Sequence, residues 1–391
     1  MKLSQNARIV LYGTMTLFFW FALYAFVPYL STHAYSMTSN TALIGTMLGA
    51  YGWAQILFRI PIGVISDRYN NRRFFIQIGC ALLLVSTLGF YFSSNVYWLI
   101  FFRAVSGISA AVWVVMSVLF GGYFAPEQRV KALTILNACN LFGQMIASLI
   151  AIPVTAKYGI SSTFLIAAAG GLIAMLISFT LKEKKFDRKP LSLKSLLAVG
   201  RSKWVLMISA MCILSQLMFF ATTSGFTPQL ALALGSAPST LGWIQLISTA
   251  GGAAFSFLSP RLFVDRFGAL NTVVVLLALQ AVTCLIQPLA GTLNLLLLIV
   301  FVNGLARGTA VSLMLGLITM PFPYEKQAAA MGFYQAFYAL GITLGPTIAG
   351  AAMEIGGLAR GFYVVGLLGL IAPVIGVFLI REKKALLEAA E

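Results

Sequence analysis

A series of long apolar runs constrains this chain more than any other feature of its sequence. A helix needs about 20 consecutive apolar residues to cross the hydrocarbon core of a bilayer. Windows of that length, bounded by charged residues, Pro, Gly or Asn, recur along the whole chain. They predict an all-α integral membrane protein with twelve transmembrane helices, at 9–31, 42–66, 73–93, 96–120, 129–155, 160–181, 203–224, 239–263, 270–289, 293–320, 328–352 and 361–380.

The charge content agrees with lipid as the main solvent of this chain. Only 9% of the residues are charged, whereas a soluble chain carries about a quarter. The net charge of +16 raises the question of a nucleic-acid partner, but the charges lie in short clusters between apolar runs. This distribution argues against nucleic-acid binding. The first run is longer than a signal-peptide core, and no small-residue cleavage site follows it, so we interpret it as a retained span.

The longest polar stretch, 182–202, divides the chain into two sets of six helices. We therefore expect an N-terminal bundle at 1–181, a cytoplasmic linker at 182–202 and a C-terminal bundle at 203–391. Most Lys and Arg residues fall on one side of the predicted membrane, and the loops of the other side hold only Lys157 and Arg360. The positive-inside rule then places both termini in the cytoplasm, with the chain in the inner (plasma) membrane.

The two halves repeat each other. The second span ends in "GVISDRYNNRR" and the eighth in "RLFVDRFGALN", so that Asp67 and Asp265 are placed alike. Gly143 in the fifth span and Gly345 in the eleventh also correspond. Parallel six-helix repeats with a cavity near the middle of the membrane are one of the main transporter architectures.

At these residues the chain resembles the major facilitator superfamily, and in particular its drug:proton antiporters and metabolite exporters. The resemblance covers essentially the whole chain. Its most specific part is the signature between the second and third spans, formed by Gly63, Asp67, Arg68, Arg72 and Arg73. Gly63 permits close helix packing, and Asp67 is able to face the positive end of a helix. The resemblance implies that this cluster latches the two halves in the outward-open state.

Two further arginines have a place in the resemblance. Arg103 and Gly107 in the fourth span resemble a motif in which the arginine takes part in proton coupling. The alternative is an arginine near the outer interface that extends to water, because Arg103 lies only about 10 Å into its helix. Arg59 lies two turns before Asp67, and we favour a gating or structural role over anion binding.

The fifth span departs from the drug-antiporter pattern. That pattern has Gly-Pro followed by small residues, whereas this chain has Gly143-Gln144. Gly-Pro is found instead in the eleventh span, at Gly345-Pro346. Small residues at this spacing favour tight helix packing.

The acidic residues are informative by their positions. None of the ten lies in the interior of a predicted span, and Glu354 at the outer end of the eleventh comes nearest. Arg307, by contrast, lies near the centre of the tenth span, in "VFVNGLARGTAVSLML". A cation at that depth needs a watery cavity or a partner. We predict that Arg307, with Asn303 one turn before it, binds the anionic group of a substrate; packing against backbone carbonyls is the alternative.

Other polar and aromatic residues lie at a similar predicted depth and are candidates for contact with the same substrate. They are Tyr24, Trp113, Asn137, Asn140, Gln144, Gln216, Gln245, Tyr334, Gln335 and Tyr338.

These features together predict a secondary transporter that works by alternating access, and not an enzyme. The sequence has no phosphate-binding Gly-rich loop, no His or Cys cluster for a catalytic metal and one histidine, so we expect no cofactor. We predict proton-coupled export (efflux by antiport) of a small anionic or zwitterionic metabolite or an amphiphilic drug, by a monomer. The alternatives are uptake (symport) or exchange of a small organic anion and, more remotely, a non-transporting membrane sensor.

Overall fold

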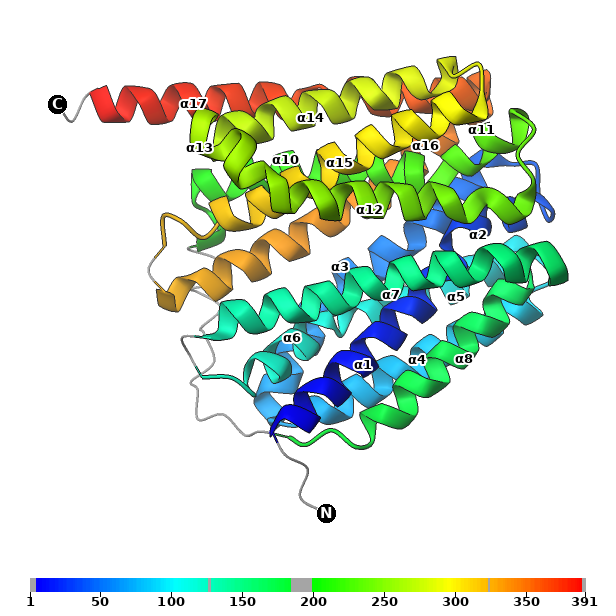
Figure 1. Ribbon diagram of the computed structural model, residues 1–391, viewed down its shortest axis with the longest axis horizontal. Helices are drawn as coiled ribbons and strands as arrows, with labels where there is room; N and C mark the ends of the chain where they lie inside the picture. Colours follow the sequence, from blue (N-terminus) through cyan, green and yellow to red (C-terminus); the bar gives the residue numbers. More distant parts are fainter. Residues whose placement is uncertain (1–4, 126–127, 184–198, 323, 389–391) are drawn as a thin grey trace. The chain divides into compact units, whose positions relative to one another are not determined.

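The computed structural model describes residues 5–125, 128–183, 199–322 and 324–388, and in these residues all regular structure is helical (Figure 1). Nine helical segments there are long and apolar enough to cross a membrane. One of them, Ala330–Glu382, contains both the eleventh and the twelfth predicted spans. Helices α8 and α12 correspond to the sixth and eighth. The predicted fold, all-α with twelve transmembrane helices, is confirmed.

The first six spans are formed by eight helices, because two spans are each divided in two. They are α1 (Gln5–Tyr24), α2 (Val27–Tyr35), α3 (Thr41–Tyr69), α4 (Arg72–Phe92), α5 (Val96–Ala111), α6 (Trp113–Gly121), α7 (Arg129–Tyr158) and α8 (Ser162–Ser178).

The last six spans include short 3-10 and π-helical segments. Their elements are α10 (Lys203–Ala221), η2 (Thr222–Phe226), α11 (Thr227–Ala233), η3 (Pro238–Leu241), α12 (Gly242–Ser259), η4 (Pro260–Val264), α13 (Asp265–Phe267), α14 (Ala269–Ile286), η5 (Gln287–Leu289), α15 (Leu293–Leu317), α16 (Tyr324–Gly369) and α17 (Ile371–Glu388).

The first and seventh spans break at equivalent prolines. Pro28 lies in the first turn of α2, just after Phe26, and Pro228 lies in the first turn of α11, just after Phe226. Phe26 has φ −103° and ψ −12°, and Phe226 has φ −108° and ψ −9°. Proline lacks an N–H and fixes φ, so it starts a new helix more readily than it continues one. The repeat seen in the sequence thus extends to backbone geometry.

A glycine pair separates the last two spans within α16. Gly356 has φ −144° and Gly357 has φ +77°, which is a left-handed conformation. A side chain at Gly357 would strain this conformation, so the pair marks the turn between the eleventh and twelfth spans.

The described helices form two compact units. Unit 1 comprises residues 1–39, 50–190 and 236–246, and unit 2 comprises residues 40–49, 191–235 and 247–391. The first turns of α3 therefore belong to unit 2, and the first turns of α12 belong to unit 1. The predicted linker falls largely on 184–198, which lies outside the described residues.

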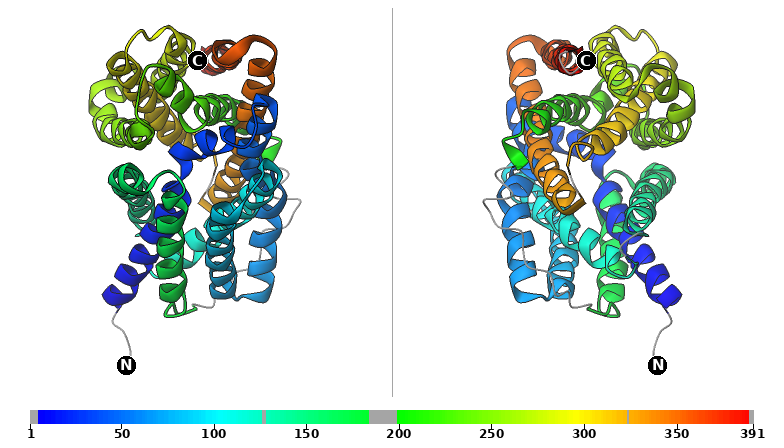
Figure 2. Two further views of the ribbon diagram at one scale, coloured as in Figure 1. Left: turned by 90° about the vertical axis from the view of Figure 1, so that its right-hand side faces the viewer. Right: turned by 90° about the vertical axis from the view of Figure 1, so that its left-hand side faces the viewer.

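Each unit is held together by helices that pack side by side. In unit 1, α1 packs against α7 and α8, and α4 packs against α5 and α8; the dark-blue α1 lies beside the green α8 (Figures 1 and 2). In unit 2, α10 packs against α16, and α14 packs against α15 and the red α17 (Figures 1 and 2).

The glycines of the fifth and eleventh spans are sites of close backbone approach. A Cβ at Gly143 would overlap the carbonyl oxygen of Leu17 on α1, and one at Gly345 would overlap that of Leu217 on α10. Corresponding glycines thus pack against corresponding helices, the first and the seventh. The prediction of tight helix packing at these small residues is confirmed.

Candidate functional site

Arg307 on α15 contacts two side chains of α10. Its Nη2 donates to Gln216 Oε1 at 3.0 Å, with Nε at 3.3 Å from the same oxygen. Its guanidinium carbon lies 3.6 Å from the centre of the Phe219 ring, which is a cation–π contact. Arg307 is half-buried, whereas Gln216 is 5% and Phe219 1% exposed. Gln216 and Phe219 are neutral groups, so these two contacts position the guanidinium without cancelling its charge.

The glycines on either side of Arg307, Gly304 and Gly308, allow α15 to pack closely against α12. A Cβ at Gly304 would overlap the carbonyl oxygen of Ser248, and one at Gly308 would overlap Gly252 on α12. This face of α15 therefore packs against the α12 backbone, and Arg307 extends from another face of the helix to α10.

Asn303 takes part in a polar network between helices. Its Nδ2 donates to Thr283 Oγ1 at 2.8 Å and to the Gln280 carbonyl at 3.3 Å, both on α14. Gln280 in turn exchanges two hydrogen bonds with Ser215 on α10, at 2.7 and 2.9 Å. Asn303 is 0% exposed. In this structure its side chain faces α14 and ties three helices together, so contact of Asn303 with the substrate stays a prediction.

Of the three predicted candidates on α16, one is buried and two are half-buried. Tyr334 is buried, its hydroxyl lies 3.5 Å from the Val311 carbonyl, and it belongs to an apolar cluster of unit 2. Tyr338 lies 6.1 Å from Tyr334 between ring centres and is half-buried, as is Gln335.

In unit 1, the predicted candidates Tyr24 and Trp113 both contact the ring of Trp20. The Trp20 ring lies 5.9 Å from Tyr24 and 5.3 Å from Trp113 on α6. Trp20 is 8% exposed, and its buried Nε1 has no acceptor among the described residues. Tyr24 and Trp113 are half-buried.

The predicted polar face of α7 is formed in part. Gln144 Nε2 donates to Asn140 Oδ1 at 2.7 Å, so these two side chains lie on the same side of the helix. Asn137 is exposed. Gln245, on the part of α12 that belongs to unit 1, is 2% exposed.

Arg103 on α5 is enclosed by aromatic rings. Its guanidinium carbon lies 4.4 Å from the centre of Tyr51 and 5.9 Å from that of Phe26, and the residue is 3% exposed. Its Nε has no acceptor among the described residues. The interpretation in which Arg103 extends to water is therefore wrong. A Cβ at Gly107 would overlap the Tyr51 carbonyl, so the small residues of this span bring α5 against α3.

Arg59 on α3 is also buried, at 4% exposed. Its Nη2 donates to Gln55 Oε1 at 2.6 Å, one turn earlier on the same helix.

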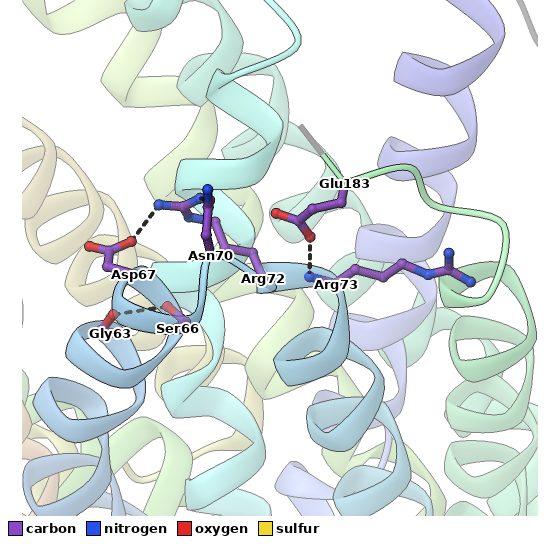
Figure 3. A network of polar contacts seen from close by, with 7 residues as sticks. All are labelled: Gly63, Ser66, Asp67, Asn70, Arg72, Arg73 and Glu183. Atoms are coloured by element: carbon purple, nitrogen blue, oxygen red, sulfur yellow. Dashed lines mark hydrogen bonds and ion pairs between the residues drawn. The ribbon is translucent and has the colours of Figure 1, made fainter. Parts of the chain in front are cut away.

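The signature between the second and third spans forms a polar cluster at the end of α3 (Figure 3). Arg72 forms an ion pair with Asp67 at 2.5 Å and donates to Asn70 Oδ1 at 3.1 Å. Arg72 is 6% exposed, whereas Asp67 and Arg68 are exposed. Among the described residues, a Cβ at Gly63 would lie no closer than 3.8 Å to its nearest neighbour, Val114. This is an ordinary contact, so our expectation that Gly63 permits close packing is corrected.

Glu183 belongs to the same cluster, although sequence reasoning did not identify it. Its Oε2 accepts from the backbone N–H of Arg73 at 2.7 Å, at the N-terminus of α4 (Figure 3). Arg73 Nη2 in turn donates to the Phe179 carbonyl at 2.5 Å. A carboxylate there is favourable because helix N-termini carry partial positive charge. Most of its sequence neighbours are Lys, so nothing in the sequence indicated that Glu183 contacts α4.

Glu354 performs a similar role in unit 2. Its Oε2 accepts from the backbone N–H of Thr41 at 2.7 Å and from the Thr41 hydroxyl at 2.8 Å, at the N-terminus of α3. A Cβ at Gly45 would overlap the Pro346 carbonyl. The acid nearest to a span interior thus caps a helix that packs closely against its own.

The structure therefore brings predicted substrate-binding candidates together in pairs, each within a single unit: Arg307 with Gln216, Gln144 with Asn140, and Tyr334 with Tyr338. Phe219 is a contact of Arg307 that the sequence analysis missed, because thirty phenylalanines give no basis for choosing one. In the described part of the chain, no group of three His, Cys, Asp or Glu side chains is placed to hold a metal ion.

Comparison with known proteins decides the family. The model of the Major Facilitator Superfamily matches residues 10–227 and again residues 208–390. The chain belongs to this superfamily. The two matches overlap at 208–227 and otherwise cover one half each, which agrees with the internal repeat. This superfamily member is a multi-pass membrane protein and a secondary transporter, not an enzyme.

Three relatives show how distant the similar proteins are in sequence. An uncharacterized MFS-type transporter of Methanocaldococcus jannaschii, MJ1560, is 22% identical over 96% of this chain and 98% of its own length. The multi-drug resistance efflux pump PmrA of Streptococcus pneumoniae is 24% identical over 80% of this chain and 79% of its own. An uncharacterized transporter of Buchnera aphidicola is 30% identical, but the match spans only 41% of this chain and 40% of that protein.

Solved structures agree on the fold. A bacterial homologue of the human lysosomal transporter Spinster, in an inward-facing and unoccupied conformation, has a TM-score of 0.79 at 14% identity, covering 97% of this chain and 98% of that one. A mutant form of the nucleoside transporter NupG has a TM-score of 0.75 at 16% identity, covering 96% of this chain and 99% of that one. At these identities the likeness concerns the fold alone.

Proposed function

We propose that this transporter exports a small anionic or zwitterionic organic metabolite, or an amphiphilic drug with an anionic group, by alternating access between its two repeats. The observation that carries the proposal is Arg307, a half-buried guanidinium in the middle of an apolar helix, positioned by the amide of Gln216 and the ring of Phe219.

The energetics favour a negatively charged ligand at Arg307. An arginine at the centre of a membrane helix costs about 2.5–3.5 kcal/mol on insertion scales, so such residues mark functional sites. An amide oxygen and an aromatic face offset part of this cost without neutralising the charge. Because no acidic residue of the sequence lies in the interior of a predicted span, a carboxylate or phosphate on the substrate is the natural counter-ion.

The proposal of export rests on a named relative. The relative PmrA is named as a multi-drug resistance efflux pump, at 24% identity. If protons drive the export, the candidates for the coupled group are Asp67, Glu354, the single histidine His33 on α2 and the carboxylate of the substrate. We further propose cytoplasmic termini, the inner membrane and a monomeric transporter, with the charged clusters Asp67–Arg72 and Glu354–Thr41 acting as gates.

A flux assay in proteoliposomes tests this proposal. A fluorescent carboxylate dye and its uncharged ester are loaded in parallel, with and without a pH gradient. We expect Arg307→Gln to slow transport of the carboxylate at least about tenfold, and the exposed Arg360→Gln to leave it unchanged. Equal carboxylate flux in wild type and Arg307→Gln would contradict anion recognition. Flux indifferent to the pH gradient would remove proton coupling, and net inward flux would favour uptake.

A further inference from the structure

A groove in unit 2 lies away from Arg307, between α10 and α17. It has a volume of about 860 Å³ and is lined by residues of both helices, among them Lys203, Leu206, Ala210, Phe378, Arg381 and Glu382. Along α10, the lining positions 203, 206, 207 and 210 have the spacing of one helix face. The lining positions 375, 378 and 382 on α17 have the same property. The groove is thus formed by two facing stripes.

The two ends of this groove differ in chemistry. Its floor is apolar, with Leu206 43% exposed and Phe378 60% exposed. Its charged residues gather where α10 begins and the apolar part of α17 stops, and there Lys203 Nζ lies 2.7 Å from Glu382 Oε1. Arg381 has no ion-pair partner among the described residues. Two cations and one carboxylate give this end a net charge of +1.

We propose that this groove binds one anionic phospholipid, with its phosphodiester on Arg381 and Lys203 and part of an acyl chain along the apolar floor. From Lys203 to Ala210 the α10 face extends about 10 Å, which is shorter than the roughly 15 Å of one hydrocarbon leaflet. A ligand that fills it has a charged head at the interface and a chain directed toward the bilayer centre. Basic pockets between membrane helices bind anionic headgroups in this way.

Charge complementarity selects the lipid class. A phosphatidylglycerol carries one negative charge, which matches the net +1 of the charged end, and its headgroup hydroxyls are donors for Glu382. Phosphatidylcholine has no net charge and no headgroup donor. The site is separate from the proposed substrate site, because neither Arg307 nor Gln216 is among the described residues that line the groove.

Native mass spectrometry of the full-length protein tests this inference. The protein is purified in detergent and titrated with phosphatidylglycerol or phosphatidylcholine of the same chain length. We expect phosphatidylglycerol to bind more tightly, and Arg381→Gln to weaken it about fivefold, since a basic residue near the membrane surface contributes about that factor. Ala210→Phe, which fills the groove and keeps every charge, should reduce binding of the same lipid. Arg266→Gln, an exposed arginine elsewhere in unit 2, is the matched control.

Three results would overturn the inference. The first is equal binding of the two lipids by the wild type. The second is unchanged phosphatidylglycerol binding in both Arg381→Gln and Ala210→Phe, each confirmed as monodisperse. The third is a dimer that Ala210→Phe dissociates, which would assign the groove to a second copy of the chain.

Discussion

Two arginines, one in each unit, show how different the surroundings of a buried cation are in this protein. Arg103 on α5 and Arg307 on α15 belong to the fourth and tenth spans, which are equivalent in the two repeats. Arg103 is 3% exposed and lies against the rings of Tyr51 and Phe26, whereas Arg307 is half-buried and hydrogen-bonded to an amide. The first is enclosed by its own unit, and the second retains surface for a ligand.

The comparison teaches that the depth of a charge in a span does not by itself reveal its role. Aromatic faces stabilise a cation by about 0.5–2 kcal/mol and exclude water. Arg307 also lies on an aromatic face, that of Phe219, and the amide of Gln216 in addition fixes the direction of its guanidinium. We therefore expect substitutions around Arg307 to change substrate affinity, and substitutions around Arg103 to change stability.

Of the substitutions around the two arginines, those at Gln216 are expected to have the largest effect, and the effect is on affinity for an anionic substrate. Gln216→Leu removes the acceptor of Arg307 Nε and Nη2 and should weaken binding of an anionic substrate about tenfold, because the guanidinium loses its orientation. Gln216→Glu, which keeps the acceptor but neutralises the site, should weaken it further. Binding titrations with the carboxylate dye measure both. Unchanged affinity in Gln216→Leu would show that this hydrogen bond does not prepare the site.

A smaller effect is expected at Tyr51, on stability and not on affinity. Tyr51→Leu removes the ring above Arg103 and should lower the midpoint of thermal denaturation by roughly 2–4 °C, as a loss of about 1 kcal/mol does in a large domain. Tyr51→Phe keeps the ring and serves as the matched control, with a smaller shift. If Tyr51→Leu instead altered the preference for carboxylate over ester, Arg103 would be part of substrate recognition and the contrast with Arg307 would fail.

The fold was predictable because its main determinant is local. The number of apolar runs long enough to cross the bilayer gives the number of spans. The breaks at Pro28 and Pro228 were found only in the structure. The close packing at Gly143 and Gly345 was predictable from small-residue spacing.

The candidate site was predictable only in part. Residues four apart on a helix differ by about 40° in direction, which is enough for Asn303 to face α14 and Arg307 to face α10. The sequence does not show which neighbour lies on each side. The contact of Glu183 with Arg73 joins residues 110 positions apart, so no local pattern reveals it.

The most direct test of the account is an affinity comparison in a two-by-two design. The carboxylate dye and its uncharged ester are each titrated against wild type and Arg307→Gln. We predict that the wild type prefers the carboxylate by about tenfold and that this preference disappears in the variant, since the charge pair exists only when both members are present. A carboxylate preference of the same size in Arg307→Gln would contradict the claim that Arg307 recognises the anionic group of the substrate.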